Sequence, residues 1–368
     1  MGLLGLSGCG SPSSASVEMS SQTELVKTGS MELQYAENFA VDYYEDGYKM
    51  LTTLPDSKRY LIVPEGQPVP RGLDEDVSIL QEPLQNIYLV ASGVMDMFAS
   101  VDAVDQIRFS GQKQENWYIQ TAKDAMAAGD MIYAGKYSKP DYELLVSEGC
   151  DLAIENRMIT HSPEVVEMLQ SFGIPVMIEY SSYEQHPLGK VEWVKFFGAL
   201  TGKEAEAEEA FAEQTEILEK VERGEKTGKT IAFFYVTSNG LIQVRQSTDY
   251  IPKLIELAGG RYIFEDLEDS GSGRSTLNMQ VEDFYAGAKD ADILIYNSSI
   301  DGGVTTLDEL IGKCNILKDF KALQEGQVYC TTNDMYQQSM AIGYLLQDMH
   351  TVLTDDDTAK LRYLFLLQ

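Results

Sequence analysis

The sequence predicts an α/β protein with two doubly wound α/β lobes bridged by one long α-helix, and a small antiparallel β extension at the N-terminus. Three observations carry this prediction. Short apolar, β-rich runs alternate with helical segments across residues 73–186, which indicates a parallel, doubly wound sheet. The same alternation restarts across residues 227–368. Between these two stretches, residues 187–226 read as one continuous helix.

Residues 31–72 are assigned to the N-terminal β extension. The segment "MELQYAENFAVDYYEDGYKMLTTL" alternates polar and apolar residues, and the turn signal Glu45-Asp46-Gly47 interrupts it. The run "RYLIVPEG" continues the pattern. Short strands joined by tight turns predict a small antiparallel sheet.

The N-terminal lobe, residues 73–186, begins with "NIYLVASG", a strand, followed by the helical segment "VMDMFASVDAV". "DQIRFSG" is a second strand. "DYELLVSEGCDLAIEN" and "PEVVEMLQSFGIPVMIEYSS" each give a helix and then a strand. Because the connections are short, we expect these strands to lie parallel in one sheet.

The C-terminal lobe, residues 227–368, repeats this pattern. "KTIAFFYVTSNG" is a strand, and "YIPKLIELAGG" is a helix that ends at a glycine pair. "VEDFYAGAKDADILIYNSS" gives a helix and a strand, "GQVYCTT" a last strand and "QQSMAIGYLLQDMHTVL" a last helix. A second doubly wound lobe is therefore predicted.

The bridging helix is expected to span residues 187–226. Pro187 suits the first turn of a helix, and an apolar side is available for packing on the lobes. The segment "GKEAEAEEAFAEQ" continues the helix on strong helix formers. A single rigid rod implies little motion between the lobes. The apolar side consists of Val191, Val194, Phe197 and Leu200.

The charge balance excludes two classes of partner. The chain has 28 Lys and Arg against 58 Asp and Glu, a net charge of −30. Nucleic-acid binding requires basic patches, and adhesion to anionic lipid requires basic clusters, so neither is expected. The acidic residues predict a well-solvated surface.

The motifs of common enzymes and metal sites are absent from the sequence. The three histidines, His161, His186 and His350, lack the spacing of a helical metal pair, and no HExxH occurs. GxSxG, GxGxxG and P-loop patterns are also missing. We therefore expect no catalytic residues, no resident metal and no catalytic cofactor.

The four cysteines form neither a disulfide framework nor a metal knuckle. The spacing of Cys314 and Cys330 leaves open whether these two pair. Cys9 stands in "MGLLGLSGCGSPSS", where small residues follow an apolar stub. This start resembles the lipobox of bacterial lipoproteins, which implies a lipidated Cys9. Residues 1–30 would then be a signal remnant, the lipobox and a flexible tether.

Ligands of doubly wound sheets bind beyond the carboxyl ends of the strands. In this chain those positions carry many Lys, Arg and Tyr side chains, although basic residues are few. A cationic, aromatic cleft suits an anionic ligand that is flat or aromatic. The candidate cleft residues are Ser92, Lys136, Tyr137, Asn156, Arg157, Tyr183, Tyr235, Arg245, Arg274 and Tyr336.

The segment "EQHPLGKVEWVKFFGALTGKEAEAEEAF", joined to two α/β lobes and a lipobox, resembles the substrate-binding lipoproteins of ABC importers for iron complexes and vitamin B12. The resemblance covers about residues 73–353. It implies a monomer, lipid-anchored to the outer face of the bacterial cell membrane, that captures a metal chelate between its lobes and does no chemistry. It further implies that the chelate passes to an ABC permease, docked through Glu143 on one lobe and Glu282 on the other.

The resemblance leaves the ligand open. Cobalamin binders of this family often carry tryptophans where this chain has Lys136-Tyr137 and Asn156-Arg157. The arginines at 157, 245 and 274 favour an acidic ligand, either a ferric siderophore or haem bound through its propionates. Haem would want an axial ligand, for which Tyr137, Tyr183 or Tyr235 could serve. The rival interpretations are a chelatase-like or nitrogenase-like enzyme and a surface protein without a transport role.

Overall fold

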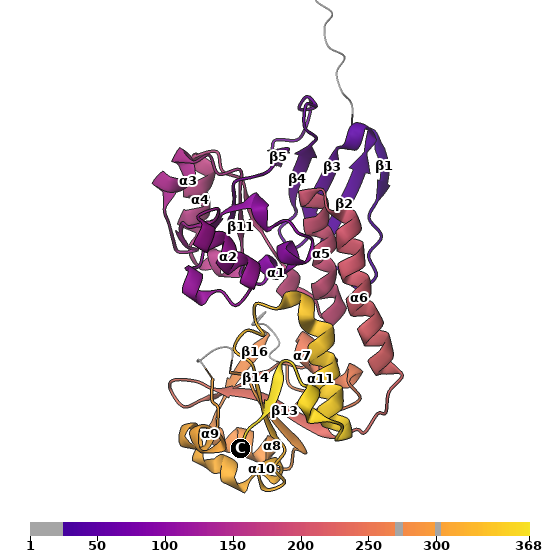
Figure 1. Cartoon of the computed structure of the whole chain (residues 1–368), viewed down its shortest axis with the longest axis vertical. Helices are drawn as coiled ribbons and strands as arrows, with labels where there is room; N and C mark the ends of the chain where they lie inside the picture. The colour runs from indigo at the N-terminus through magenta and orange to yellow at the C-terminus, as the bar shows by residue number, and fades with distance from the viewer. Residues whose placement is uncertain (1–24, 269–274, 299–302) are drawn as a thin grey trace, which may run out of the picture.

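The computed structural model describes residues 25–268, 275–298 and 303–368. Cys9 and Arg274 lie outside these residues. An N-terminal sheet and lobe one form the upper half of the molecule in Figure 1, and lobe two forms the lower half. Helix α6 lies along one side, and α5 lies between α6 and α1. Within the described part of the chain, we find no helix with the length and apolarity needed to cross a membrane.

The N-terminal extension is a five-stranded sheet in chain order. Its first four strands are antiparallel, as predicted, whereas the fifth is parallel to the fourth. The first strand lies within the stretch expected to be a flexible tether, and the fifth carries the sheet past residue 72. The strands are β1 (Lys27–Ser30), β2 (Phe39–Tyr44), β3 (Lys49–Thr53), β4 (Lys58–Val63) and β5 (Val77–Gln81).

One face of this sheet packs into the main core of the molecule. Phe39 of β2 contacts two aromatic side chains of α5, with ring centroids 4.9 Å from Trp193 and 5.3 Å from Phe196. The buried Tyr60 hydroxyl of β4 donates a 2.9 Å hydrogen bond to the Val176 carbonyl of lobe one. The extension is therefore an integral part of the folded protein.

Lobe one contains a five-stranded parallel sheet in the order β12-β11-β6-β7-β8, which confirms the prediction of a doubly wound lobe. A short hairpin of β9 (Gly135–Lys136) and β10 (Lys139–Pro140) follows β8. The sheet strands are β6 (Ile87–Leu89), β7 (Ile107–Ser110), β8 (Ile132–Tyr133), β11 (Leu152–Glu155) and β12 (Val176–Ile178). The helices are α1 (Val94–Ser100), α2 (Gln120–Ala128), α3 (Tyr142–Ser147) and α4 (Pro163–Ser171).

The strand β11 shows why lobe one has two layers of core. All four of its residues are buried. Because side chains alternate across a strand, Leu152 and Ile154 join the main core, whereas Ala153 joins an outer cluster with Tyr88 and Leu145. The continuous apolar run of a central parallel strand follows from burial on both faces.

Lobe two is a mixed sheet in the order β16-β14-β13-β17-β18-β19, and β15 pairs in parallel with the first residues of β13. Its centre, β13, β17 and β18, is parallel, and antiparallel strands flank it. The strands are β13 (Thr230–Val236), β14 (Ile242–Arg245), β15 (Arg261–Tyr262), β16 (Thr276–Met279), β17 (Ile293–Tyr296), β18 (Val328–Thr331) and β19 (Leu364–Leu366). The helices are α7 (Tyr250–Leu257), α8 (Val281–Ala288), α9 (Leu307–Lys313), α10 (Lys321–Gln324) and α11 (Ile342–Thr354).

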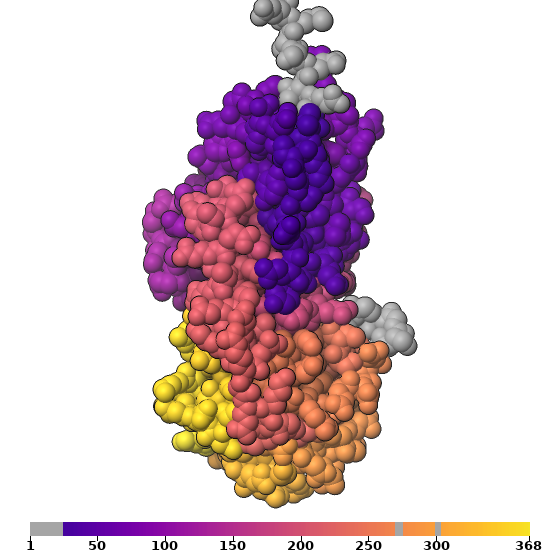
Figure 2. Space-filling model, turned by 90° about the vertical axis from the view of Figure 1, so that its right-hand side faces the viewer, coloured from indigo at the N-terminus to yellow at the C-terminus, as the bar shows by residue number. Residues whose placement is uncertain are grey.

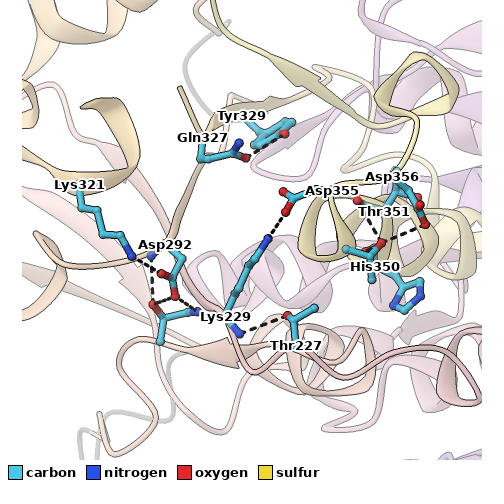
Figure 3. Close-up of polar contacts among 12 residues, drawn as sticks. Thr227, Lys229, Asp292, Lys321, Gln327, Tyr329, His350, Thr351, Asp355 and Asp356 are labelled. Carbon is cyan, nitrogen blue, oxygen red and sulfur yellow. Dashed lines mark hydrogen bonds and ion pairs between the residues drawn. The ribbon is translucent and has the colours of Figure 1, made fainter. Parts of the chain in front are cut away.

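A polar network closes lobe two at the amino ends of its central strands (Figure 3). Asp292, just before β17, accepts hydrogen bonds from the Thr230 backbone N–H at 2.7 Å and from the Lys321 ammonium at 2.5 Å. Lys229 pairs with Asp355, beyond α11, at 2.6 Å. These contacts tie β13 to β17 and α11 at the edge of the sheet away from the strand carboxyl ends.

The bridging segment is two helices, not the single helix expected over residues 187–226. α5 (Pro187–Thr201) ends at Gly202, which adopts a left-handed conformation at φ 72°, and α6 (Glu204–Glu222) begins two residues later. A glycine readily adopts this conformation, so it reverses the chain. The two helices pack side by side as a hairpin (Figure 1), and a Cβ on Gly198 would lie only 2.6 Å from Ala207.

The two helices have different roles in packing. The four apolar side chains predicted to pack on the lobes are buried in α5, and Trp193 and Phe196 on its other sides are buried as well. A helix that is apolar all round lies in a core. α6 is amphipathic, with Phe211 and Leu218 buried, and runs along the side of the molecule from the extension to lobe two (Figure 1). The element that spans both lobes is therefore α6.

Two buried carboxylates attach the extension to the start of α5. Glu192 accepts hydrogen bonds from the backbone N–H groups of residues 34, 35 and 36 at 2.8–2.9 Å. Glu184, three residues before α5, accepts from the N–H groups of residues 37 and 38 at 2.9 and 3.0 Å. Figure 2 shows the extension, in indigo, beside α6 and reaching down to the border of lobe two.

Candidate functional site

A cavity of about 310 Å³ lies between the two lobes. Lobe one contributes the segments that follow the carboxyl ends of β11 and β12, as expected for a doubly wound sheet. Lobe two contributes the start of α7 and the residue before β16. We call this cavity the Arg157 chamber; its lining residues are Arg157, Ser182, Tyr183, Glu184, Gln185, Thr248, Asp249, Tyr250 and Ser275.

Arg157 is the cation of this chamber. It is exposed, and its guanidinium lies 3.9 Å from the centre of the Tyr183 ring. No carboxylate among the described residues forms an ion pair with it. A guanidinium that stacks on an aromatic face keeps its N–H edge available for a planar anion. The chamber therefore offers a cationic and aromatic surface to a ligand.

Local structure positions this pair. Asn156 directly follows β11 and caps the next 3-10 turn, where its side-chain oxygen accepts the Met158 N–H at 2.8 Å. On the neighbouring strand end, the buried Glu179 carboxylate accepts both the N–H and the hydroxyl of Ser181, at 2.9 and 2.6 Å. Of the candidate cleft residues, the structure thus brings Arg157 and Tyr183 together, and Asn156 caps the turn that carries Arg157.

Arg245 has a different role from the one expected. Its guanidinium is 3.4 Å from the Asp249 carboxylate, and both side chains are largely buried, with 17% and 3% exposed. The Tyr262 hydroxyl donates to the Arg245 carbonyl and accepts its N–H. Arg245 therefore forms a buried ion pair with Asp249. Asp249 itself lines the Arg157 chamber and caps α7 by accepting the Ile251 N–H.

Tyr336 marks another contact between the lobes. Its ring, from lobe two, packs edge-on against Tyr118 of lobe one with centroids 6.3 Å apart, and the two side chains are 41% and 43% exposed. The buried Gln337 amide accepts the Tyr118 N–H and donates to the Asn116 carbonyl, both at 2.8 Å. The sequence analysis missed Tyr118 and Gln337 because no local pattern distinguishes them.

A third inter-lobe contact involves a carboxylate. Asp96 of α1 accepts the Met340 N–H of lobe two at 2.7 Å. Burial raises the pKa of Asp96 to about 6, although the hydrogen bond from Met340 acts in the opposite direction. The protonation state of the Asp96 carboxylate therefore changes at mildly acidic pH.

The remaining cleft candidates lie apart from the Arg157 chamber. Ser92 follows β6, and the next residue, Gly93, abuts lobe two, because a Cβ there would lie 2.7 Å from the Ser339 hydroxyl. Lys136 is exposed in the β9–β10 hairpin. Tyr137 and Tyr235 pack against the outer clusters of lobe one and lobe two. Lys136, Tyr137 and Tyr235 do not line the chamber.

A second cavity, of about 360 Å³, adjoins the first. The extension contributes to it, which the sequence analysis did not anticipate. The two cavities share four residues, namely Glu184, Gln185, Thr248 and Asp249. We call the second cavity the Tyr35 chamber; the rest of its lining is Tyr35, Glu37, His186, Ser247 and Lys253.

The other predicted features are placed as follows. Glu143 and Glu282 are exposed in the first turns of α3 and α8. Cys314 and Cys330 are both buried, and no disulfide bond joins them. In the part of the chain that the structure describes, no cluster of three or more His, Cys, Asp or Glu is arranged to hold a metal ion.

The chain is distantly similar in sequence to known proteins. No family model matches the chain. An uncharacterized lipoprotein of Methanocaldococcus jannaschii is 24% identical over 351 residues, which is 87% of this chain and 81% of the relative. A second uncharacterized lipoprotein of that organism is 24% identical over 322 residues, 84% of this chain and 79% of the relative.

Solved structures give the fold. A periplasmic heme-binding protein of Vibrio cholerae matches with a TM-score of 0.58 at 15% identity, over 73% of this chain and 98% of its own. A periplasmic catecholate-siderophore binding protein of the same organism matches with a TM-score of 0.56 at 11% identity, over 75% of this chain and 95% of its own. An ABC transporter substrate-binding protein of Listeria monocytogenes matches with a TM-score of 0.55 at 15% identity, over 73% of this chain and 98% of its own. The chain has the fold of the periplasmic solute-binding proteins.

Ligand sites of proteins occur preferentially in clefts between domains. The Arg157 chamber occupies that place in this chain. The match to the Vibrio heme-binding protein covers nearly all of that chain but leaves about a quarter of this one outside. This chain therefore contains structure beyond the fold that it shares with the Vibrio protein.

Proposed function

We propose that the protein is an extracytoplasmic solute-binding protein that captures a ferric-siderophore-type iron complex between its lobes and delivers it to an ABC importer permease. The observation that carries the proposal is Arg157, a cation with no carboxylate partner among the described residues, held against Tyr183 inside the inter-lobe chamber. The iron in this proposal is cargo within a chelate, so the protein needs no metal ligands of its own.

The chemistry of the chamber suits a chelate with negative charge and aromatic rings. Ferric catecholates carry both features. The guanidinium can donate paired hydrogen bonds to chelate oxygens, and the partly buried rings of Tyr183 and Tyr250, which line the chamber, can contact the aromatic rings of the chelate. The chain has a net charge of −30, which on the whole repels anions. A cation inside the cleft offsets this repulsion locally and favours an anionic ligand there.

Anchoring and docking complete the proposal. Cys9, in its lipobox-like context, would carry the lipid, and two relatives are themselves called lipoproteins. An anchor keeps the protein near the permease and raises its effective concentration there. Glu143 and Glu282, exposed in the first turns of α3 and α8, would each dock on the permease.

Haem is the second candidate, and one observation favours it. Tyr183 presents a phenol beside Arg157, so one cleft offers both an axial oxygen ligand and a cation for a propionate. A haem complex would show a tyrosinate-type visible spectrum that Tyr183→Phe abolishes. A ferric catecholate would keep its own visible band in that variant.

The test is thermal unfolding of the purified protein with ferric catecholates, ferric hydroxamates, haem and cobalamin. A ligand at 100 times its dissociation constant adds about 2.7 kcal/mol of stability. We expect a shift with an anionic ferric chelate and a loss of that shift in Arg157→Gln. Arg223→Gln, which removes an exposed arginine at the C-terminal end of α6, is the control. No shift with any compound would refute the proposal.

A further inference from the structure

The Tyr35 chamber has a wall that the N-terminal extension builds. The Tyr35 ring stacks on the His186 ring with centroids 4.4 Å apart and an interplanar angle of 20°. The backbone beside Tyr35 is fixed, because the N–H groups of residues 34–38 all donate to Glu192 or Glu184. This wall is therefore rigid before any ligand arrives, which lowers the entropic cost of binding.

His186 presents a hydrogen-bond donor at this wall. Its Nδ1 accepts the Leu188 N–H at 3.2 Å, so the neutral ring carries its proton on Nε2. Burial lowers the pKa of His186, and the nearby charge of Lys253 lowers it further. The ring is thus neutral at neutral pH and can donate one hydrogen bond.

Lys253 of α7 is the cation of the Tyr35 chamber. Its ammonium is 2.9 Å from the Glu256 carboxylate, but that pair is solvent-exposed, with 39% and 67% of the side chains accessible. Exposed pairs of this kind contribute little, so a bound anion can compete with Glu256.

Two acidic residues of the chamber wall are already satisfied. Glu184 accepts two backbone N–H groups and the Trp193 indole N–H. Asp249 is paired with Arg245 and caps α7. Glu37 is exposed. The groups left to meet a ligand are thus the Lys253 ammonium, the His186 donor and the Tyr35 ring, with Glu37 as the free carboxylate.

We propose that the Tyr35 chamber is a second subsite of the cleft, which takes an acidic or oxygen-rich arm of the captured chelate. This inference rests on the proposed function. The two chambers share Glu184, Gln185, Thr248 and Asp249, so one ligand can reach Arg157 with one arm and Lys253 with another. The extension then acts as a specificity element, because Tyr35 and Glu37 come from it.

The test measures the affinity of the full chain for ferric catecholate, ferric hydroxamate and haem by isothermal titration calorimetry. For the chelate that binds wild type, we expect Lys253→Gln to weaken binding about tenfold or more, since a hydrogen bond to a charged group is lost. Tyr35→Ala should also weaken binding. Lys289→Gln, which removes a lysine just after α8 and beside Tyr285, should leave the affinity unchanged.

The outcomes separate the two proposals. If no chelate binds wild type, the proposed function and the second subsite both fall. If a chelate binds and Arg157→Gln weakens it, while Lys253→Gln and Tyr35→Ala both bind as tightly as wild type, only the second subsite falls. Lys253 is partly exposed on a helix, so its variant is expected to fold with an unchanged melting temperature.

Discussion

The buried side-chain oxygen of Gln337 in lobe two accepts the backbone N–H of Tyr118 in lobe one, at 2.8 Å. The same amide donates to the Asn116 carbonyl at 2.8 Å and to the Tyr336 hydroxyl at 2.9 Å. One side chain thus satisfies two backbone groups across the lobe boundary. The lobes are held in contact at this point as well as through α6.

Gln337→Ala is expected to destabilise the protein by about 1–3 kcal/mol, because it truncates a fully buried side chain and removes its hydrogen bonds to two partly buried backbone groups of lobe one. It should also widen the spread of lobe orientations. Chemical denaturation and small-angle X-ray scattering measure these two effects. Gln338→Ala, at the neighbouring and less buried position, is the control. A variant with wild-type stability and scattering would show that the Gln337 contact does not hold the lobes together.

Asp96 should make stability depend on pH. Its pKa is raised from 3.8 to about 6 by burial, so the folded protein binds this proton more tightly than the unfolded chain. Ionised Asp96 therefore destabilises the folded protein at pH 7.5, and the stability rises as the carboxylate is protonated between pH 6 and pH 4.

We expect the stability of wild type relative to Asp96→Asn to rise by about 2 kcal/mol between pH 7.5 and pH 4. The asparagine oxygen can still accept the Met340 N–H, so the variant removes the titration and keeps the contact. Urea unfolding at both pH values measures the difference. A difference that is constant with pH would contradict a raised pKa.

Glu192 should be essential for the attachment of the extension. Its buried carboxylate accepts three N–H groups and lies 3.5 Å from the Lys195 ammonium, whose side chain is 4% exposed. Glu192→Gln removes the charge that accepts these hydrogen bonds, which should cost about 1.5–3 kcal/mol, while Lys195 keeps its pair with Glu208. Hydrogen exchange at residues 34–36 should accelerate in the variant.

Glu208→Gln is the matched control for Glu192. Glu208 also pairs with Lys195, at 3.0 Å, but its side chain is 60% exposed, so its loss should cost about 1 kcal/mol or less. If the two variants were equally stable, burial of the Glu192 carboxylate would have no special role in holding the extension.

The sequence predicted the alternation of strands and helices well, because each element carries its own periodicity. "LAIE" and "VMI" are apolar enough to be buried strands whatever surrounds them. The break at Gly202 was missed, because a glycine inside a run of helix formers is compatible with both a continued helix and a helix end. Only the packing of α5 on α6 decides between the two.

The site was predicted less completely, because it depends on partners distant in sequence. Arg157 and Tyr183 follow strand ends, so the topology of the sheet located both. Arg245 has the same residue type and a similar position, but the fold pairs it with Asp249. Tyr35 reaches the cleft only because Glu184 and Glu192 hold its loop, and they are about 150 residues away in the chain.

Glu143 and Glu282 are expected to act in delivery and not in capture. Both are exposed in the first turns of their helices, and neither lines the Arg157 or the Tyr35 chamber. Glu143→Ala and Glu282→Ala should therefore leave the affinity for the chelate within about twofold of wild type, since no ligand contact is lost. Uptake of the chelate by cells should fall sharply in either variant and further in the double variant.

Two other exposed carboxylates provide controls for this prediction. Glu164 in the first turn of α4 and Asp308 in the first turn of α9 carry the same charge in the same kind of position. Their alanine variants should support normal uptake, because neither residue is expected to contact the permease. Reduced uptake in these controls would mean that a general loss of negative charge explains the effect of Glu143→Ala and Glu282→Ala. Weakened chelate binding in Glu143→Ala or Glu282→Ala would place that residue in the cleft, and normal uptake in the double variant would remove both from the permease contact.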